Sequence, residues 1–390
     1  MVTQNVNKPA CADVIVSLQL EYSVEEPLNR EPDLETLVSS FITRTGEGYD
    51  RNHGPIPHLS AATHRVSVYG AVKRTLSLSV ADLEALPQRS VVCALQCAGN
   101  RRHTMRTKLK EVNGIDWFDG AVMNCKWSGP LLSDVLALAG IDLPPSSHDA
   151  AHVAFACFQT PTQDDEWYGS SIPLSRALSP SAEILLALRM NDAPLPPNHG
   201  FPVRVVTPGI AGARSVKWLD RITVQTCESS NYYQQHDYKI LPPEAKDKES
   251  AEKWWGRVPA IMDMPVNSVI GVPKVGARVK ADAEGRVEVK GYALPSGEEG
   301  PVARVEVSVD EGRSWSEAEL LGAEGVEGAE SLKWAWCLWR ARVKVEKGNN
   351  KSIWSRATDK AGNVQVKNPQ WNFRGVAYNG YGEVTGLEIV

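Results

Sequence analysis

A cysteine followed closely by two arginines is the most unusual local feature of this sequence. Cys97 leaves an apolar run, enters a Gly-Asn turn and is followed by Arg101 and Arg102. Neighbouring guanidinium charge favours the thiolate form of cysteine, and thiolate is the form that binds a soft metal. The alternative is a buried core thiol, which is the commoner situation for a cysteine. The residues around Cys97 therefore allow metal binding without deciding it.

Two further clusters combine cationic side chains with glycine and proline. One is RNHGPIP (51–57), and the other is NHGFPVR (198–204) with GIAGARSVKW (209–218) after it. Small residues let a backbone approach a ligand closely, and Arg, His, Ser and Lys side chains suit a phosphate or another anion. The spacing of the glycines and the lysine is not that of a Walker nucleotide-binding loop. A solvated surface loop and an ordinary glycine-rich turn remain the alternatives.

The elements that must position these clusters predict a mixed first region. Alternating or continuous apolar runs predict strands at 64–72, 91–96, 182–190, 201–207 and 218–226. A capping serine predicts a helix at 79–86, and helical spacing before Gly140 predicts another at 131–139. Residues 1 to about 60 have the composition of irregular coil. The region as a whole is expected to be α+β.

The second region has a different pattern. A charged, proline-flanked segment at 242–259 indicates a linker or a surface excursion. After it, only strands are predicted, at 286–294, 304–310, 334–345 and 351–359. Several strands without a helical period are typical of a β-sandwich. We therefore expect an α+β domain over residues 1–260 and an all-β domain over residues 261–390.

Composition and charge exclude several classes of protein. The 390 residues are 42% hydrophobic and 23% charged, as in a globular protein, and the net charge of −5 gives no general reason to bind nucleic acid or an acidic membrane. No run approaches the ~20 apolar residues that cross a bilayer. Neither terminus carries a secretion signal or a peroxisomal Ser-Lys-Leu address. We expect a soluble intracellular protein, with cytoplasm, peroxisome and mitochondrion all left open.

The remaining cysteines are expected to have a structural role. The chain contains seven cysteines, an odd number, and no pair has the spacing of a zinc finger. Such a set is no disulfide framework, so the six besides Cys97 are expected to be core thiols.

Taken together and in this order, the motifs resemble the molybdenum domain of the sulfite oxidase family, particularly its plant-type members without a haem domain. The resemblance extends over nearly the whole chain and is carried by RNHGPIP, LQCAGNRR, NHGFPVRVV, GARSVKWLD, DYK and WNFRG. It implies a molybdopterin-binding α+β domain followed by an immunoglobulin-like domain that forms a homodimer. It also implies Mo-molybdopterin as the cofactor and oxidation of sulfite to sulfate by oxygen-atom transfer. The cofactor carries that chemistry, and the protein positions the anion.

The resemblance also implies a role for each matching residue. Cys97 would be the metal ligand. The pocket for the anion would be lined by Arg51, Arg102, Trp117, Tyr238 and Arg374. The pterin and its phosphate would be held by His53, Cys97, His199, Arg204, Ser215, Val216 and Lys217, and by the backbone of Tyr49, Asp50, Arg51 and Asn52. Contact is further expected near 157–159, where the family often has a charged residue and this chain has Phe158-Gln159. Guanidinium forks suit the oxygens of a small dianion such as sulfite.

Two alternative functions are weighed against this one. The molybdenum domain of assimilatory nitrate reductase shares the fold, the cofactor and the cysteine. Nitrate reductases tend to have Asn and Met at the positions of Tyr238 and Arg374, so this chain matches the sulfite-oxidising type. A cofactor-free binding protein on the same fold is the other alternative, and the presence of Cys97 with all three pocket arginines argues against it.

The partners follow from the same resemblance. The chain contains no His-Pro-Gly-Gly segment of a haem-binding domain. Molecular oxygen is therefore the expected electron acceptor, giving hydrogen peroxide, and a separate cytochrome is the alternative. Several tryptophans of the second region are expected to fill its interior and others to lie in the dimer interface: Trp315, Trp334, Trp336, Trp339 and Trp354.

Overall fold

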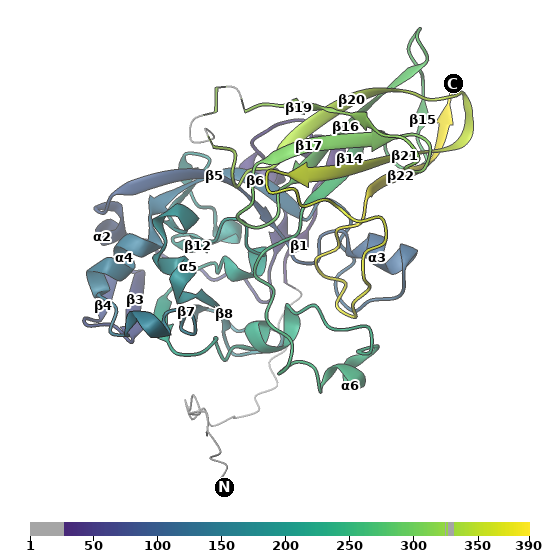
Figure 1. Cartoon of the computed structure of the whole chain (residues 1–390). Coiled ribbons are helices and arrows are strands. Elements are labelled where there is room, and N and C mark those ends of the chain that lie inside the picture. The colour runs from purple at the N-terminus through teal and green to yellow at the C-terminus, as the bar shows by residue number, and fades with distance from the viewer. Residues whose placement is uncertain (1–26, 324, 327–330) are drawn as a thin grey trace.

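The chain folds into two regions that differ in secondary structure (Figure 1). The computed structural model describes residues 27–323, 325–326 and 331–390. Among the described residues, short helices and four sheets of two to five strands make up the first region, and two sheets of four and five strands make up the second. The predicted order of an α+β region followed by a mostly β region is therefore present. Within the described ranges, no helix has the length and apolar character that crossing a membrane requires.

A five-stranded sheet supports one side of the first region. Its order is β4-β3-β13-β7-β8, and only β3 and β13 run parallel. Val66, Val68 and Ile222 point from the sheet into a core that also contains Leu132 and Leu136 of α4. The strands are β3 (Arg65–Gly70), β4 (Leu76–Ser79), β7 (His152–Cys157), β8 (Tyr168–Pro173) and β13 (Arg221–Gln225).

The described part of the chain contains six short α-helices, and two of them begin or end as the sequence predicts. Ser79 and Asp82 form a reciprocal capping box at the start of α2. The helix α4 ends at Gly140, whose φ of +68° favours glycine. The helices are α1 (Leu34–Leu37), α2 (Val80–Glu84), α3 (Arg102–Lys108), α4 (Leu132–Ala139), α5 (Leu174–Leu178) and α6 (Lys248–Ala251).

A second sheet delivers the cysteine motif. Its order is β11-β10-β6-β5, and β5 is buried from Val91 to its end. The strand predicted at 182–190 is divided in two, because β9 pairs with β12 whereas β10 pairs with β6. The strands of this part are β1 (Asn29–Arg30), β2 (Asp50–Arg51), β5 (Gln88–Gln96), β6 (Val122–Pro130), β9 (Leu185–Ala187), β10 (Arg189–Met190), β11 (Ala193–Pro194) and β12 (Arg204–Val206).

The second region consists of two sheets that share one core. One has the order β14-β16-β20-β19 and the other β15-β22-β21-β17-β18. Val289 and Trp339 of the first sheet meet Val305, Ile353 and Leu387 of the second. The strands are β14 (Asn267–Val272), β15 (Arg278–Val279), β16 (Arg286–Leu294), β17 (Val302–Ser308), β18 (Ser316–Glu317), β19 (Glu319–Leu321), β20 (Cys337–Lys344), β21 (Gly348–Asp359) and β22 (Gly382–Ile389).

The segment predicted as a linker is folded onto the protein surface. It contains α6, which begins with a capping box between Asp247 and Ser250. Ala245, Ala251 and Trp255 are buried, and Phe373 of the C-terminal segment packs against their cluster. The segment is therefore a surface excursion rather than an open linker.

The burial of three tryptophans and the state of the cysteines can be compared with what the sequence predicts. Trp336 and Trp339 are fully buried, and Trp334 nearly so, which places all three in the interior. Cys93, Cys125, Cys157 and Cys337 are free thiols, and the first three are buried. Cys227 was expected to be a core thiol and is instead disulfide-bonded. Cys11 lies outside the described residues.

Candidate active site

Cys97 lies where two cavities meet. Strand β5 ends at Gln96, and a turn closed by a hydrogen bond from the Asn100 amide to the Cys97 carbonyl (3.0 Å) follows at once. The thiol is free and buried. Cys97 lines both cavities, together with Arg51, His53 and Tyr238. A ligand atom at this junction would face residues drawn from both sides.

The first cavity contains most of the residues predicted to hold the pterin. Nine of the eleven predicted residues line it: Tyr49, Arg51, Asn52, His53, Cys97, His199, Arg204, Ser215 and Lys217. Sequence reasoning missed Met123, Thr160, Thr162, Tyr168, Gly212, Ala213 and Trp218, which also line it.

Two predicted pterin residues and one predicted segment lie elsewhere. Asp50 forms an ion pair with Arg30 (2.9 Å) and accepts a hydrogen bond from Asn198 Nδ2 (2.7 Å). The Val216 side chain belongs to the core beneath the five-stranded sheet. The segment 157–159 does not line the cavity, because Cys157 is in the core, Phe158 is exposed and the Gln159 amide donates to Asp220 (2.7 Å).

The first cavity concentrates buried basic side chains. Burial, reinforced by the charge of Arg204, lowers the pKa of Lys217 to about 7. Burial also lowers the pKa of Arg204 to about 10. The pKa of His199 falls to about 4, because the ring is buried and lies near Lys217. Such a cluster suits a multiply charged anion such as a phosphate.

The side chains of this cavity fit the phosphate and ring of a molybdopterin. The Asn52 Nδ2 amide is buried and has no hydrogen-bond partner among residues 27–323, 325–326 and 331–390, so it is a donor available to a ligand. Its Oδ1 is held by Lys217 Nζ, which also donates to the Asn198 carbonyl (2.9 Å). A Cβ at Gly212 would lie 2.8 Å from Tyr49 Oη, so only glycine leaves this wall open. The unpaired Asn52 donor, the basic side chains and the wall left open at Gly212 together match a ligand with a polar ring and a phosphate.

The second cavity contains all five residues predicted for anion binding, namely Arg51, Arg102, Trp117, Tyr238 and Arg374. Arg102 is fixed by hydrogen bonds to the carbonyls of Arg374 (Nε, 2.9 Å) and Ile115 (Nη1, 2.7 Å). Trp117 Nε1 and Arg374 Nε are buried donors without a partner in the described part of the chain. A buried donor without an acceptor is unfavourable, so these groups suit the oxygens of a bound anion.

Sequence reasoning missed the residues that hold the second cavity in shape. Arg374 forms an ion pair with Asp237 and donates to Asn113. Asn29 Oδ1 accepts from Arg51 Nη1 (3.2 Å), because β1 pairs with β2 and places Asn29 opposite Arg51. Asp237 directly precedes Tyr238 in the DYK motif, which was the one signal available for it.

The Cys97 thiol experiences two opposing influences. Burial raises the pKa of the Cys97 thiol above its ordinary value, and the guanidinium groups of Arg102 and Arg51 work against this shift. The arginines alone therefore do not make the group a thiolate at neutral pH. A bound metal ion would, because a coordinating thiol loses its proton.

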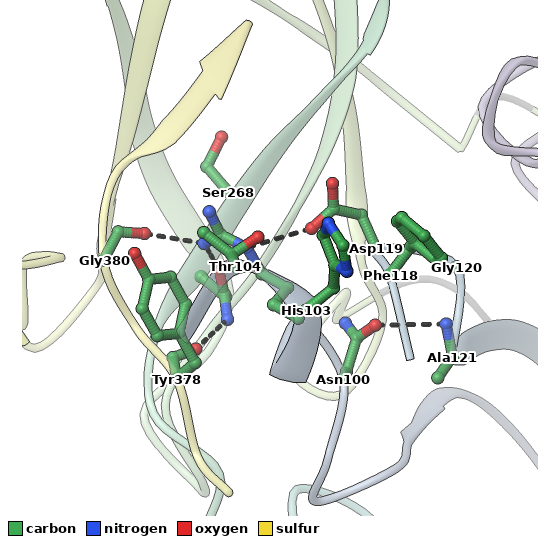
Figure 2. A network of polar contacts seen from close by, with 12 residues as sticks. Asn100, His103, Thr104, Phe118, Asp119, Gly120, Ala121, Ser268, Tyr378 and Gly380 are labelled. Carbon is green, nitrogen blue, oxygen red and sulfur yellow. Dashed lines mark hydrogen bonds and ion pairs between the residues drawn. The ribbon is translucent and has the colours of Figure 1, made fainter. Parts of the chain in front are cut away.

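The turn after Cys97 is fastened to the second region (Figure 2). Arg101 is 2% exposed and donates to Asn267 Oδ1 (2.7 Å), to the carbonyl of Gly380 (2.6 Å) and to that of Tyr381 (2.8 Å). Asn100 bridges the Ala121 amide (3.0 Å) and the Tyr292 hydroxyl (3.0 Å). The catalytic turn is therefore shaped by both regions.

Comparison with known proteins gives the class to which such a fold and site belong. Residues 53–233 match the description "Oxidoreductase molybdopterin binding domain", and residues 258–385 match "Mo-co oxidoreductase dimerisation domain". A cysteine between a cationic cavity and an arginine-lined cavity, on these two domains, defines an oxidoreductase that binds the molybdenum cofactor.

The chain belongs to the sulfite oxidase family. It is 42% identical over 382 residues to the mitochondrial sulfite oxidase of Mus musculus, covering 96% of this chain and 67% of that protein. It is 40% identical over 369 residues to the sulfite oxidase of Arabidopsis thaliana, covering 92% of this chain and 91% of that protein. The NADH nitrate reductase of Ulva prolifera is 33% identical, covering 91% of this chain and 41% of that protein. The crystal structure of the sulfane dehydrogenase SoxCD from Paracoccus pantotrophus has a similar fold, with a TM-score of 0.72 and 24% identity. The match covers 94% of this chain and 89% of that chain.

Proposed function

We propose that this protein oxidises sulfite to sulfate at a molybdenum centre bound by Cys97. The observation that carries the proposal is the second cavity, in which three arginines, Trp117 and Tyr238 surround one face of Cys97. Sulfite is a small dianion, and its oxygens match the directed donors of guanidinium groups. Sulfite oxidases with about 40% identity support the same reaction for this chain.

The protein's own residues would bind and orient the reacting anion. The molybdenum cofactor, when bound, supplies the oxygen-atom transfer and the change in redox state. Arg102 and Arg51 would lie beside the anion, and the unpaired donors of Trp117 and Arg374 would complete its hydrogen bonds. Arg204, Lys217 and His199 would hold the cofactor from the first cavity. The two groups of residues meet at Cys97, so cofactor and anion would be presented to each other there.

A nitrate-reducing function is the weaker alternative. The matched nitrate reductase is less similar than the sulfite oxidases, at 33% identity. Tyr238 and Arg374 both line the second cavity, and they are the two positions expected to separate the activities. Their presence supports the sulfite-oxidising assignment.

We further propose molecular oxygen as the electron acceptor, with hydrogen peroxide as the product. The resemblance of the motifs to plant-type members without a haem domain motivates this choice, and a separate cytochrome is the competing acceptor. The test is stopped-flow reoxidation of sulfite-reduced protein with oxygen and with a cytochrome, after elemental analysis has shown molybdenum. Fast reoxidation by the cytochrome alone would replace oxygen as the acceptor, and absence of reduction by sulfite would reject the proposed function.

Arg374→Met is expected to raise the KM for sulfite about ten- to hundredfold. The variant loses one charge-assisted contact to the anion, which is worth about 1.5–3 kcal/mol. Steady-state kinetics of the molybdenum-loaded variant measures the effect, and a nitrate reduction assay shows whether methionine shifts the specificity. Arg340→Met is the control, because Arg340 on β20 forms an exposed ion pair with Glu319 on the neighbouring strand β19. An unchanged KM in Arg374→Met would show that this arginine does not contact sulfite.

The second region is proposed to be an immunoglobulin-like dimerisation domain over residues 261–390, following a catalytic domain over residues 1–260. Its match to the description of a dimerisation domain supports this, and so does its pair of sheets with a common core. Of the five tryptophans expected to be divided between the interior and an interface, Trp315 and Trp354 are only partly buried, so they remain available to an interface.

The protein is expected to be a homodimer in solution. Two-fold pairs are the commonest form of homo-oligomer. Light scattering at micromolar concentration would then give a mass of about twice the 42.7 kDa of one chain. A mass equal to one chain over this range would contradict the dimer without affecting the assignment of the site.

A further inference from the structure

Three side chains that line both cavities form one chain of hydrogen bonds. Arg51 Nη2 lies 3.1 Å from His53 Nδ1, and His53 Nε2 lies 2.7 Å from Tyr238 Oη. A guanidinium group can only donate, so Nδ1 of the imidazole must accept. The single proton of the neutral ring is therefore assigned to Nε2, which donates to the tyrosine oxygen.

This donation determines what the tyrosine hydroxyl can do. Its oxygen accepts from His53, so its own proton is free to be donated in another direction. Within the described residues, His53 is the only hydrogen-bond partner of that hydroxyl. Tyr238 lines both cavities at the junction with Cys97, so the group left to receive its proton is a ligand in that space.

The imidazole is held in this orientation by its neighbours. The ring centroid of His53 lies 3.8 Å from that of Tyr233 and 5.5 Å from that of Tyr168. Tyr233 begins a π-helical turn, Tyr233–Asp237, that leads directly into Tyr238. One short segment therefore supplies both the ring against which His53 packs and the hydroxyl to which it donates.

The two nitrogens of His53 are thus both engaged within the chain. The imidazole has no nitrogen to offer to a pterin, although it lines the cavity and was expected to contact the cofactor. Burial lowers the pKa of His53 well below its ordinary value, and the charge of Arg51 adds to this. Burial raises the pKa of Tyr238 well above its ordinary value. Both groups accordingly keep the protonation states that the hydrogen bonds require.

We propose that His53 is a positioning residue. It orients the Tyr238 hydroxyl so that this hydroxyl donates a hydrogen bond to the substrate anion beside Cys97. The role deepens the proposed sulfite oxidation and rests on it. Arg51 has two functions in this arrangement, since it fixes the imidazole through Nη2 and lines the anion cavity. His53 acts through Tyr238, and its contribution disappears when the tyrosine hydroxyl is absent.

The test is a double-mutant cycle between these two residues. His53→Phe keeps an aromatic ring against Tyr233 and removes the donor, so kcat per molybdenum is expected to fall about tenfold, the value of one hydrogen bond. His53→Gln is expected to restore most of that loss, because its amide nitrogen can donate to Tyr238. In a Tyr238→Phe background, His53→Phe is expected to have no further effect. His148→Phe, outside both cavities, is the control and should keep wild-type kcat.

Two readouts independent of turnover separate this role from cofactor binding. Molybdenum content of His53→Phe is expected to equal that of wild type. Nitrogen-15 NMR of histidine-labelled, cofactor-loaded protein should show a ring signal with the proton on Nε2 that is absent from His53→Phe. Multiplicative losses in the double variant, a fall in molybdenum content with unchanged kcat per molybdenum, or a proton on Nδ1 would each overturn the proposal. Wild-type protein that does not oxidise sulfite would instead overturn the proposed function, and this role with it.

Discussion

Replacing Cys97 with serine is expected to reduce sulfite oxidation to at most a few per cent of wild type while the fold stays intact. A soft thiolate is the ligand that the metal requires here, and an alcohol of high pKa is a poor substitute. The cavity residues Lys217, Arg204 and Asn52 are unchanged in the variant, so most of the cofactor binding should persist. Turnover per bound molybdenum, with thermal unfolding as the check on folding, measures the effect.

The control for this variant is Cys337→Ser. Cys337 is a free, partly exposed thiol on β20 in the second region, and it lines neither cavity. It should keep wild-type turnover. Substantial activity in a molybdenum-replete Cys97→Ser protein would contradict the assignment of Cys97 as the metal ligand.

The site residues that could be predicted are those that belong to contiguous motifs. Cys97 and Arg102 lie in one run of sequence, and Arg51 and His53 in another, and the structure brings both runs to the same junction. Arg374 was assigned to the anion pocket only through the resemblance, because its motif lies near the end of the chain, far in sequence from the other motifs. Its ion pair with Asp237 joins positions far apart in sequence, and no local pattern indicates such a contact.

The side chains of two predicted pterin residues do not line the first cavity. Asp50 and Val216 each lie between residues that do line the first cavity. The Val216 side chain joins the core, and the Asp50 side chain pairs with Arg30. Strand alternation accounts for Asp50, which precedes Arg51 in β2. It does not hold through the motif, because the consecutive residues Arg51, Asn52 and His53 all line the cavity. The alternation alone therefore could not have excluded these two side chains.

Some of the lining residues that were missed come from segments without a distinctive pattern, whereas Gly212, Ala213 and Trp218 belong to the GARSVKW motif. Thr160 and Thr162 lie in the loop after β7, and Tyr168 begins β8. The sequence of a loop does not indicate which way its small polar side chains point, because the path of the loop depends on tertiary contacts. One such contact is the hydrogen bond from the Thr160 hydroxyl to the Pro55 carbonyl (3.1 Å), which spans 105 positions.

The second region contributes to the catalytic turn as well as to assembly. The amide of Ala377 donates to the carbonyl of Ala98 (2.8 Å), one residue after Cys97. The backbone of Arg374 accepts from Arg102 on the other side of the turn (2.9 Å). In Figure 2 the network around Asn100 lies next to Tyr378 and Gly380 of the C-terminal segment. A disturbance in this segment should therefore reach the residues around Cys97.

Arg101 is the residue on which this attachment depends most. Its side chain is almost fully buried and donates hydrogen bonds to Asn267 Oδ1 and to the carbonyls of Gly380 and Tyr381. Its Nε lies 3.2 Å from Asp119 Oδ1. Its backbone has a φ of +68°, a conformation that a side chain other than glycine rarely adopts. Tertiary contacts must hold the residue in this conformation.

Arg101→Leu is expected to cost about 3–5 kcal/mol of stability, because removal of one partner from a buried charged network leaves the others unpaired. Leucine keeps the same backbone preference, so the loss reports the side-chain contacts. Urea denaturation measures the change, and turnover per molybdenum should fall as well, because the turn that carries Cys97 loses its attachment. The matched control is Arg106→Leu on the same helix, whose partners Glu111 and Asp116 are exposed. Exposed pairs are worth at most about 1 kcal/mol, so equal losses in the two variants would show that Arg101 does not fasten the turn to the second region.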